Sequence, residues 1–453
     1  MGNNAAQTTE NLEILTGPVF RPGDDGYDAE IAGFQTAYTH RPALVVGAVH
    51  TEDVRAAVEY AARHDLPIAV QATGHGLSVA TDGGLLISTR RMTGIRIDAA
   101  RRTAYVGAGV RAGALVEAAA EHGLAPPNGS SPSVGVVGYL LGGGVGLLAR
   151  QFGYAAEHVR TIELVTADGR VRTLTPQDDL FGAVLGSGGN FGVVTGLEVG
   201  LVPVQTVYGG QLVFDTPLVE RALEAWRRWT ATVPDEVTST VTMLAFPDIP
   251  PVPAPLRGRY VASVRVAYTG PAEEGDRLVA PLRAVGERLK DDLRAMPYTE
   301  SHTIHSDPDH PHAYAATNAL LGAFTEETAA ALLAVAGPES GAGAVVDVRH
   351  LGGALARAGE AGIAVDHRDA AYIVRIITGP EETEARAGIR AALTPWALGH
   401  SLNFLYGAGA EADEAQTRAG YRADTYARLA ALKARHDPRN LFRCNRNIRP
   451  DAG

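Results

Sequence analysis

Glycine is concentrated in three short stretches of the first 200 residues, and this feature constrains the chain most. The 453-residue chain has 52 glycines, and the three stretches are Gln71–Gly76, Asn128–Gly146 and Gly186–Thr195. Because glycine lacks a Cβ atom, successive backbone N–H groups can turn toward a diphosphate. Three such loops predict an extended ligand with a diphosphate in its middle, and three packing turns are the ordinary alternative.

The glycine-rich stretches lie in a region that alternates strands and helices. The pattern predicts a strand at 43–46, a helix capped by Thr51 and a strand at 68–70. Asp168-Gly169, between two apolar runs, predicts a hairpin. Beyond residue 205 the predicted order of strands and helices changes to one that is typical of an α+β domain with an antiparallel sheet. Its predicted strands and final helix are 210–214, 238–245, 260–268, 345–348, 372–377 and 414–435.

Charge and composition exclude several classes of protein. A formal net charge of −11 disfavours nucleic-acid binding, because the chain repels phosphate backbones. No apolar run reaches the roughly 18 residues that a membrane helix needs. The polar segment 1–15 does not resemble a secretion signal, so we expect a cytoplasmic protein without membrane contact. The single cysteine, Cys444, excludes a disulfide framework and a cysteine-ligated metal cluster.

Two common site types fit the sequence poorly. Gly142–Gly146 resembles a Rossmann fingerprint, but no strand immediately precedes it, which disfavours a nicotinamide site. His302, His305, His310 and His312 lie in a loop rich in Pro and Asp, where their spacing fixes no ligand set. We therefore predict no metal site. The unusual element is the histidine in the first glycine-rich turn, His75, for which a turn histidine is the ordinary interpretation.

Taken in order, the three stretches and the tail 432–447 resemble the FAD-linked oxidases of the berberine-bridge-enzyme type, within the vanillyl-alcohol-oxidase superfamily. The resemblance covers nearly the whole chain. It implies an α+β fold with a PCMH-type FAD-binding domain of two subdomains at 1–205. It also implies an α+β substrate domain with a large antiparallel sheet at 206–400, and a C-terminal segment, 401–453, that returns to the FAD domain.

The resemblance implies that His75 attaches covalently to FAD, since a neutral imidazole is a competent nucleophile near pH 7. Many relatives make a second bond through a cysteine where this chain has Ser131. A serine offers no thiolate, so we predict a single link. The other residues that we expect to bind FAD are Ala72, Thr73, Gly74, Gly76, Ser130, Ser131, Val134, Gly135, Gly138, Gly142, Gly143, Gly144, Gly146, Gly192, Val194, Asn403, Asn445 and Asn447.

The implied activity is an oxidase that passes a hydride from a small or medium organic substrate, such as an alcohol, a sugar or a natural-product intermediate, to the flavin. Molecular oxygen would reoxidise the flavin and give H₂O₂; in the family, a small residue at Val134 accompanies oxygen access. A dehydrogenase with an organic acceptor, an oxidative cyclase of natural-product biosynthesis and a non-catalytic flavin-binding module stay open as alternatives. The oligomeric state and the substrate stay open too.

The catalytic base is the least determined element of the site. Hydride transfer needs a base that faces the flavin. Relatives often carry a tyrosine two residues before an asparagine, but here Ser401 precedes Asn403 in that spacing. The favoured candidate is Tyr139, because it stands where several relatives carry a histidine beside the flavin. The remaining candidates are Tyr372, Tyr406 and His367.

Overall fold

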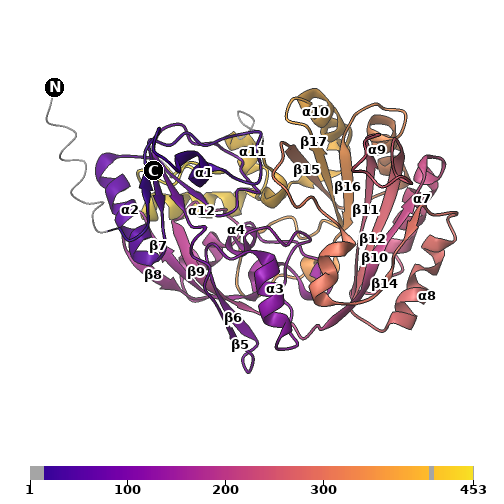
Figure 1. Cartoon of the computed structure of the whole chain (residues 1–453), viewed down its shortest axis with the longest axis horizontal. Helices are drawn as coiled ribbons and strands as arrows, with labels where there is room; N and C mark the ends of the chain where they lie inside the picture. Colours follow the sequence, from indigo (N-terminus) through magenta and orange to yellow (C-terminus); the bar gives the residue numbers. More distant parts are fainter. Residues whose placement is uncertain (1–14, 408–412, 452–453) are drawn as a thin grey trace.

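The structure, a computed structural model that describes residues 15–407 and 413–451, begins with a small sheet (Figure 1). Its strand order is β1-β2-β4-β3, and β2, β4 and β3 run parallel. The helix α2 starts at Thr51, but its N-cap is His50, whose side chain accepts a hydrogen bond from Asp53 N. The prediction that Thr51 caps this helix was therefore wrong. The elements are β1 (Val19–Phe20), α1 (Tyr27–Ile31), β2 (Leu44–Gly47), α2 (Thr51–His64), β3 (Ile68–Gln71) and β4 (Leu85–Ser88).

A second, antiparallel sheet has the order β5-β6-β9-β7-β8. Gly169, with φ of +74°, closes the β7–β8 hairpin that Asp168-Gly169 predicted. The helices α3 and α4 contact this sheet. Its elements are β5 (Ile95–Asp98), β6 (Thr103–Gly107), α3 (Ala112–Ala120), α4 (Val136–Leu141), α5 (Ala149–Phe152), β7 (Val159–Val165), β8 (Val171–Leu174), α6 (Asp179–Val184) and β9 (Val193–Gly200).

The other half of the molecule is built on a nine-stranded antiparallel sheet of order β13-β10-β12-β11-β16-β17-β15-β18, with β14 also paired to β10. Its strands include the five predicted ones, whereas β13, β14, β15 and β18 were not predicted. The fold class, α+β with a large antiparallel sheet, is confirmed. The strands are β10 (Thr206–Phe214), β11 (Val237–Ala245), β12 (Tyr260–Tyr268), β13 (Lys290–Asp291), β14 (Arg294–Pro297), β15 (Ala315–Leu321), β16 (Val345–His350), β17 (Tyr372–Thr378) and β18 (Ala397–Gly399).

The two faces of the nine-stranded sheet differ in polarity. Four helices cover the outer face, away from the first half of the molecule (Figure 1). Val346, Val348 and Val374 belong to the apolar core on that face. Side chains alternate between the two faces along a strand. The residues between these core positions, among them Asp347 and Arg375, therefore lie on the inner face. The helices are α7 (Val219–Thr230), α8 (Ala272–Arg283), α9 (Glu326–Ala336) and α10 (Thr383–Ala392).

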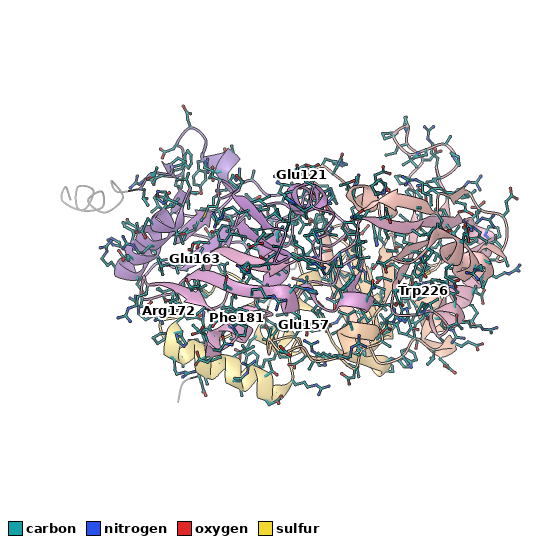
Figure 2. The ribbon with its side chains drawn as sticks, turned by 90° about the horizontal axis from the view of Figure 1, so that it is seen from below. Glu121, Glu157, Glu163, Arg172, Phe181 and Trp226 are labelled. Carbon is teal, nitrogen blue, oxygen red and sulfur yellow. The ribbon has the colours of Figure 1, made fainter. Side chains whose placement is uncertain are left out.

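The C-terminal segment returns to the first half, where α12 contacts α6 (Figure 1). The predicted helix at 414–435 is two helices, α11 (Glu414–Arg418) and α12 (Ala423–His436), separated by a turn that contains Gly420. Phe181 and Trp226, both fully buried, mark the separate cores of the two halves (Figure 2). Short 3₁₀ turns occupy Ala155–His158, Thr216–Leu218, Tyr298–Ile304, Gly353–Ala356, Thr394–Trp396 and Leu402–Phe404.

Within residues 15–407 and 413–451, none of the helices combines the length and the apolar character that crossing a bilayer requires. The first fourteen residues, which the sequence analysis compared with a secretion signal, lie outside the described part of the chain.

A buried arginine joins the two halves. Arg150, on α5, donates hydrogen bonds to Val237 O (2.8 Å) on β11 and to Nε2 of His350 (2.9 Å) on β16. Burial, with a contribution from Arg150, lowers the pKa of His350 from 6.5 to about 3. The folded protein therefore keeps His350 neutral at a pH at which the unfolded chain protonates it.

This histidine predicts a loss of stability in mild acid. The contribution of neutral His350 to the free energy of unfolding is present in full above pH 6.5. It decreases as the pH drops toward 3, because in this range only the unfolded state binds the proton. When the pH is lowered from 7 to 5, the free energy of unfolding should decrease in both proteins. We expect the decrease to be about 2 kcal/mol smaller in His350→Gln than in the parent protein. Urea titrations at both pH values measure this difference. His310→Gln, at an exposed position, is the control, and equal losses in all three proteins would contradict the assignment.

Candidate functional site

A cavity of about 500 Å³ lies between the two halves, and all three glycine-rich stretches line it. The inner face of the nine-stranded sheet and the C-terminal segment complete its wall. The predicted FAD-binding residues that line it are Ala72, Thr73, Gly74, His75, Gly76, Ser130, Ser131, Val134, Gly135, Gly138, Gly142, Gly192, Val194, Asn403 and Asn445.

His75 is held rigidly in the first glycine-rich loop, directly after β3. Its Nδ1 lies 2.9 Å from Thr73 Oγ1, and its Nε2 lies 2.9 Å from Ser133 Oγ. The imidazole stacks on the Phe34 ring, with centroids 3.8 Å apart and planes 12° apart. Burial, with a smaller contribution from Arg111, lowers the pKa of His75 to about 4. The imidazole is therefore neutral near pH 7, the form in which a ring nitrogen can act as a nucleophile.

The glycines of the cavity wall leave room for a ligand next to the main chain. A Cβ atom added at Gly76, Gly138, Gly188 or Gly189 would meet no other atom within 4 Å. By contrast, Gly74, with φ of +70°, is required locally, because a Cβ atom there would lie 2.6 Å from Gly33 Cα. Bare backbone on three loops around one cavity fits a dinucleotide with a diphosphate. The residues present therefore fit FAD.

Three of the predicted FAD-binding glycines do not line this cavity. Gly143, Gly144 and Gly146 instead allow close packing: a Cβ atom at Gly144 would lie 2.7 Å from the Tyr139 ring, and one at Gly143 would lie 2.8 Å from Val365. Asn447 is also absent from the cavity wall. Within the run that resembles a dinucleotide fingerprint, Gly142 lines the cavity, whereas Gly144 and Gly146 pack against Tyr139 and Gly143 packs against Val365.

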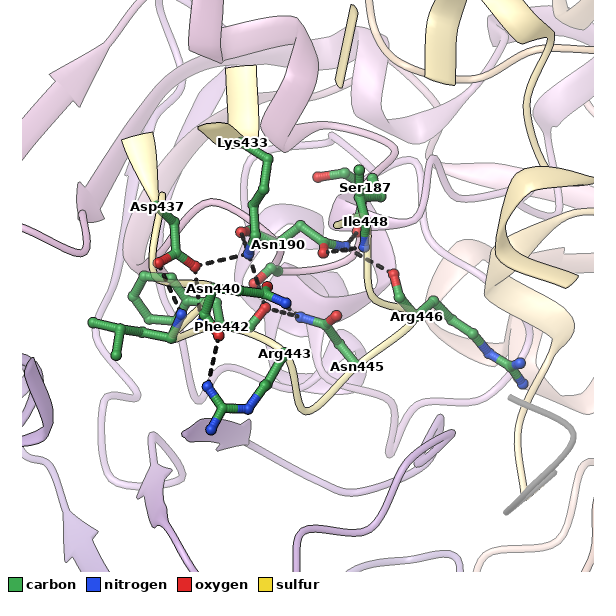
Figure 3. A network of polar contacts seen from close by, with 12 residues as sticks. Ser187, Asn190, Lys433, Asp437, Asn440, Phe442, Arg443, Asn445, Arg446 and Ile448 are labelled. Atoms are coloured by element: carbon green, nitrogen blue, oxygen red, sulfur yellow. Dashed lines mark hydrogen bonds and ion pairs between the residues drawn. The ribbon is translucent and has the colours of Figure 1, made fainter. Parts of the chain in front are cut away.

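A buried polar network fixes the C-terminal segment against the third glycine-rich loop (Figure 3). Nζ of Lys433 donates hydrogen bonds to Asn190 O (2.6 Å), Asp437 Oδ2 (2.8 Å) and Phe442 O (3.0 Å). The Asn190 side chain donates to Ser187 O and Arg446 O and accepts from Ile448 N. This network positions Asn445, whose Nδ2 donates to Gly189 O at 3.2 Å.

Removing the ammonium group from this network is expected to destabilise the protein strongly. Lys433 and Asp437 are fully buried, and Lys433→Ala leaves the Asp437 carboxylate without its buried counter-charge. We expect a loss of about 3–5 kcal/mol in the free energy of unfolding, measured by urea titration. The control Arg435→Ala removes a surface ion pair with Asp179 and should cost at most about 1 kcal/mol. Equal effects of the two variants would show that the network is not a major source of stability.

Tyr139 lines the cavity, but its hydroxyl is poorly suited to take a proton. The hydroxyl is buried and has no hydrogen-bond partner among the described residues. Burial raises the pKa of Tyr139, and Arg349 opposes this effect only partly. Its ring packs against Gly129 and Gly144. Tyr139 is the base candidate that the sequence favoured. Its environment in the structure disfavours this role.

Tyr406 also lines the cavity and has a cationic neighbour. Nη2 of Arg375 donates a hydrogen bond to the Tyr406 hydroxyl at 3.3 Å. The Tyr406 ring meets the Tyr314 ring edge to face, 5.3 Å between centroids, and the Tyr314 hydroxyl donates to His75 O at 2.7 Å. A chain of contacts thus connects Tyr406 to the loop that carries His75.

The other two base candidates predicted from the sequence lie away from the cavity. Tyr372 is on the helix-covered face of β17, where its hydroxyl pairs with Thr230 (2.7 Å) and its ring packs near Trp226. His367 lies beside Gly399 and is absent from the cavity wall. Neither side chain lines the space in which a flavin and its substrate would meet.

Several cavity residues had no signal in the sequence. Arg349 and Arg375 come from separate strands and belong to no motif. His312 belongs to the histidine-rich loop that we set aside, and Tyr314 follows that loop. Among the described residues, no three His, Cys, Asp or Glu side chains come together as metal ligands do. Ser187, Gly188 and Gly189 could have been found, because they belong to the third glycine-rich stretch.

Ser131 and Cys444 both line the cavity. The Ser131 hydroxyl lies 2.9 Å from the Ser133 hydroxyl, which in turn contacts His75. The Cys444 thiol lies 3.5 Å from Thr81 Oγ1, and burial raises its pKa. Because a raised pKa keeps the thiol protonated, Cys444 is a weak nucleophile in this position.

Family models match two parts of the chain. The model described as "FAD binding domain" matches residues 42–175, and the model described as "Berberine and berberine like" matches residues 410–449. The (R)-6-hydroxynicotine oxidase of Paenarthrobacter nicotinovorans is 30% identical over 469 residues, covering 96% of this chain and 97% of the relative. This chain belongs to the berberine-bridge-enzyme-like family of FAD-linked oxidoreductases. An FAD-linked oxidoreductase of Dictyostelium discoideum is 26% identical over 97% of this chain and 96% of its own length.

Solved structures of the berberine-bridge-enzyme-like family share the fold. The 6-hydroxy-D-nicotine oxidase from Arthrobacter nicotinovorans superposes with a TM-score of 0.81 at 28% identity, covering 96% of this chain and 98% of that chain. The xylooligosaccharide oxidase from Myceliophthora thermophila C1 has a TM-score of 0.86 at 19% identity, covering 98% and 100%. The family assignment and the PCMH-type fold are thereby confirmed, and the protein is an FAD-dependent oxidoreductase.

Proposed function

We propose that this protein is an oxidase in which FAD, bound in the cavity between the two halves, accepts a hydride from a small organic molecule and is reoxidised by O₂. The bound flavin supplies the redox chemistry. The single observation that carries the proposal is the convergence of three backbone-exposing loops, a neutral His75 and Tyr406 on one cavity. In this arrangement the cofactor is held by residues 1–205 and 401–453. The wall that faces the substrate is formed by residues 206–400.

His75 is the proposed point of covalent attachment, and no second attachment through a cysteine is proposed. The support is the geometry of the imidazole: Phe34 fixes its plane, while Thr73 and Ser133 occupy its two nitrogens. The ring is preoriented and uncharged, so the nitrogen that accepts a hydroxyl hydrogen bond carries the lone pair needed for attack on an electrophilic carbon. The N–C bond would replace a C–H bond and the imidazole N–H bond, with loss of both protons, and O₂ would take up the two electrons. Ser131 stands where a second link would need a thiolate.

Tyr406 is the proposed base. It is the tyrosine on the cavity wall whose hydroxyl accepts a hydrogen bond from a guanidinium, and the positive charge of Arg375 lies next to the oxygen that would take part in proton transfer. The Tyr139 hydroxyl has no such partner in the part of the chain that the structure describes. The proton that leaves the substrate during hydride transfer would move to the phenolate oxygen of Tyr406.

The oxidase proposal is tested by reoxidation. The purified protein is expected to be yellow, and a substrate that bleaches the flavin anaerobically should be oxidised with one H₂O₂ formed per turnover in air. The measurement is rapid mixing of the reduced protein with aerated buffer, followed at the flavin absorbance, together with a peroxide assay. Slow reoxidation that accelerates only with an organic acceptor would identify a dehydrogenase instead.

A further inference from the structure

The inner face of the nine-stranded sheet carries three arginines close to one another. Arg265 on β12 and Arg349 on β16 lie in one row, on either side of Thr240 of β11. Arg375 on β17 lies in the next row, where it pairs in register with Asp347. Arg349 and Arg375 line the cavity directly. The inner face of the sheet thus carries a guanidinium on each of β12, β16 and β17, and two of the three line the candidate site.

These three cations exceed the buried anions that face them. Asp347 is the buried carboxylate of the cluster, 3.7 Å from Arg375 Nη1 and hydrogen-bonded to Thr242. Asp307, the second acidic group near the arginines, is exposed at the rim, where Ser130 donates to it. The buried part of the cluster therefore holds an excess of positive charge, which is costly without a counter-anion.

The hydrogen bonding of the arginines is incomplete. The buried Nε atoms of Arg265, Arg349 and Arg375 have no hydrogen-bond partner among the described residues. Arg349, only 4% exposed, donates to Val145 O at 3.1 Å, and Arg375 donates to the Tyr406 hydroxyl. These Nε atoms are buried and do not themselves face the cavity. A guanidinium has five N–H donors, however, so Arg349 and Arg375, which both line the cavity, have further N–H groups that can donate to an acceptor.

An aromatic surface lies beside the two cavity arginines. The Phe404 ring lies under both guanidinium groups, at 4.5 Å from Arg375 and 5.7 Å from Arg349. Tyr406, Tyr314 and Ile377 add further apolar surface to the same wall. A ligand that fits this wall combines an anionic group with an apolar or aromatic body.

We infer that the substrate is a carboxylate with an aromatic or apolar body, whose carboxylate is bound by Arg349 and Arg375 next to Tyr406. Guanidinium groups match the planar carboxylate with paired hydrogen bonds. The inference rests on the proposed function, because it assigns the substrate class of the same cavity. If the arginines acted only on the flavin, the affinity of the oxidised protein for a ligand would not depend on the charge of that ligand.

The test compares two ligands of matched shape on the oxidised, flavin-loaded protein. Benzoate and its neutral counterpart benzamide are titrated by calorimetry and by the change in flavin absorbance. We expect benzoate to bind at least about tenfold more tightly, the effect of one charge-assisted hydrogen bond. Because this comparison uses the parent protein, it does not depend on the folding of any variant. Equal affinities, or no binding of benzoate, would overturn the inference.

Variants then assign the effect to the arginines. Arg375→Gln and Arg349→Gln should each weaken benzoate binding at least about tenfold and leave benzamide unchanged, whereas Arg375→Lys should retain part of the preference. The control is Arg228→Gln, on the outer helix α7. A shifted flavin midpoint potential with unchanged benzoate affinity would overturn the inference in favour of a role toward the reduced flavin. Protein that contains no flavin at all would instead refute the proposed function, so the two failures are distinct.

Discussion

We expect the His75→Ala protein to release all of its flavin when it is precipitated with acid, whereas the parent protein gives a yellow pellet. The imidazole is the only nucleophile that the first glycine-rich loop offers, and its pKa of about 4 keeps it uncharged at neutral pH. Without the ring nitrogen, FAD can be held only by the noncovalent contacts of the cavity wall. The measurement is the flavin absorbance of pellet and supernatant.

A matched control separates loss of the bond from loss of the fold. His310→Ala removes an exposed histidine outside the cavity wall and should leave the pellet yellow. The circular dichroism spectra of all three proteins should coincide. Flavin that stays in the pellet of His75→Ala would show that another residue carries the bond, and Cys444 would be the first to examine because it lines the same cavity.

Tyr406→Phe is expected to lower the rate of flavin reduction about 100- to 10,000-fold, the usual contribution of a positioned acid or base. The substitution keeps the ring that packs against Tyr314 and removes the oxygen that accepts the Arg375 hydrogen bond. Flavin content should therefore be unchanged. Anaerobic rapid mixing with a substrate that bleaches the parent protein gives the rate constant.

The control for this variant is Tyr372→Phe, which removes a hydroxyl bonded to Thr230 on the helix-covered face of the same sheet. Its reduction rate should stay within about twofold of the parent value. A large defect in Tyr372→Phe, or a normal rate in Tyr406→Phe, would contradict the choice of base. A comparable defect in Tyr139→Phe alone would return the role to the residue that the sequence favoured.

The cofactor side of the site could be predicted because its signals are local. A strand, a tight turn and small residues specify the loop around His75 within ten residues of sequence, and each of the three loops reaches the cavity. Gly143, Gly144 and Gly146 show the limit of such signals. A glycine that accommodates a neighbouring ring has the same sequence pattern as one that faces a phosphate, and only the packing distinguishes them.

The substrate side could not be predicted because it depends on strand register. Tyr372 and Arg375 belong to the same strand, yet a difference of three positions puts them on opposite faces of the sheet. Arg349 becomes their neighbour only through the pairing of β16 with β17, and Tyr406 reaches this wall through an isolated bridge to Ala316. Neither relation has a spacing rule in the sequence.

The most direct test of the account is the intact mass of the purified parent protein after denaturation, followed by peptide mapping. We expect a mass higher than that of the polypeptide by one FAD, with the flavin on the peptide that contains His75 and no second attachment at Cys444. An unmodified polypeptide mass, or flavin located on any other peptide, would contradict the central claim.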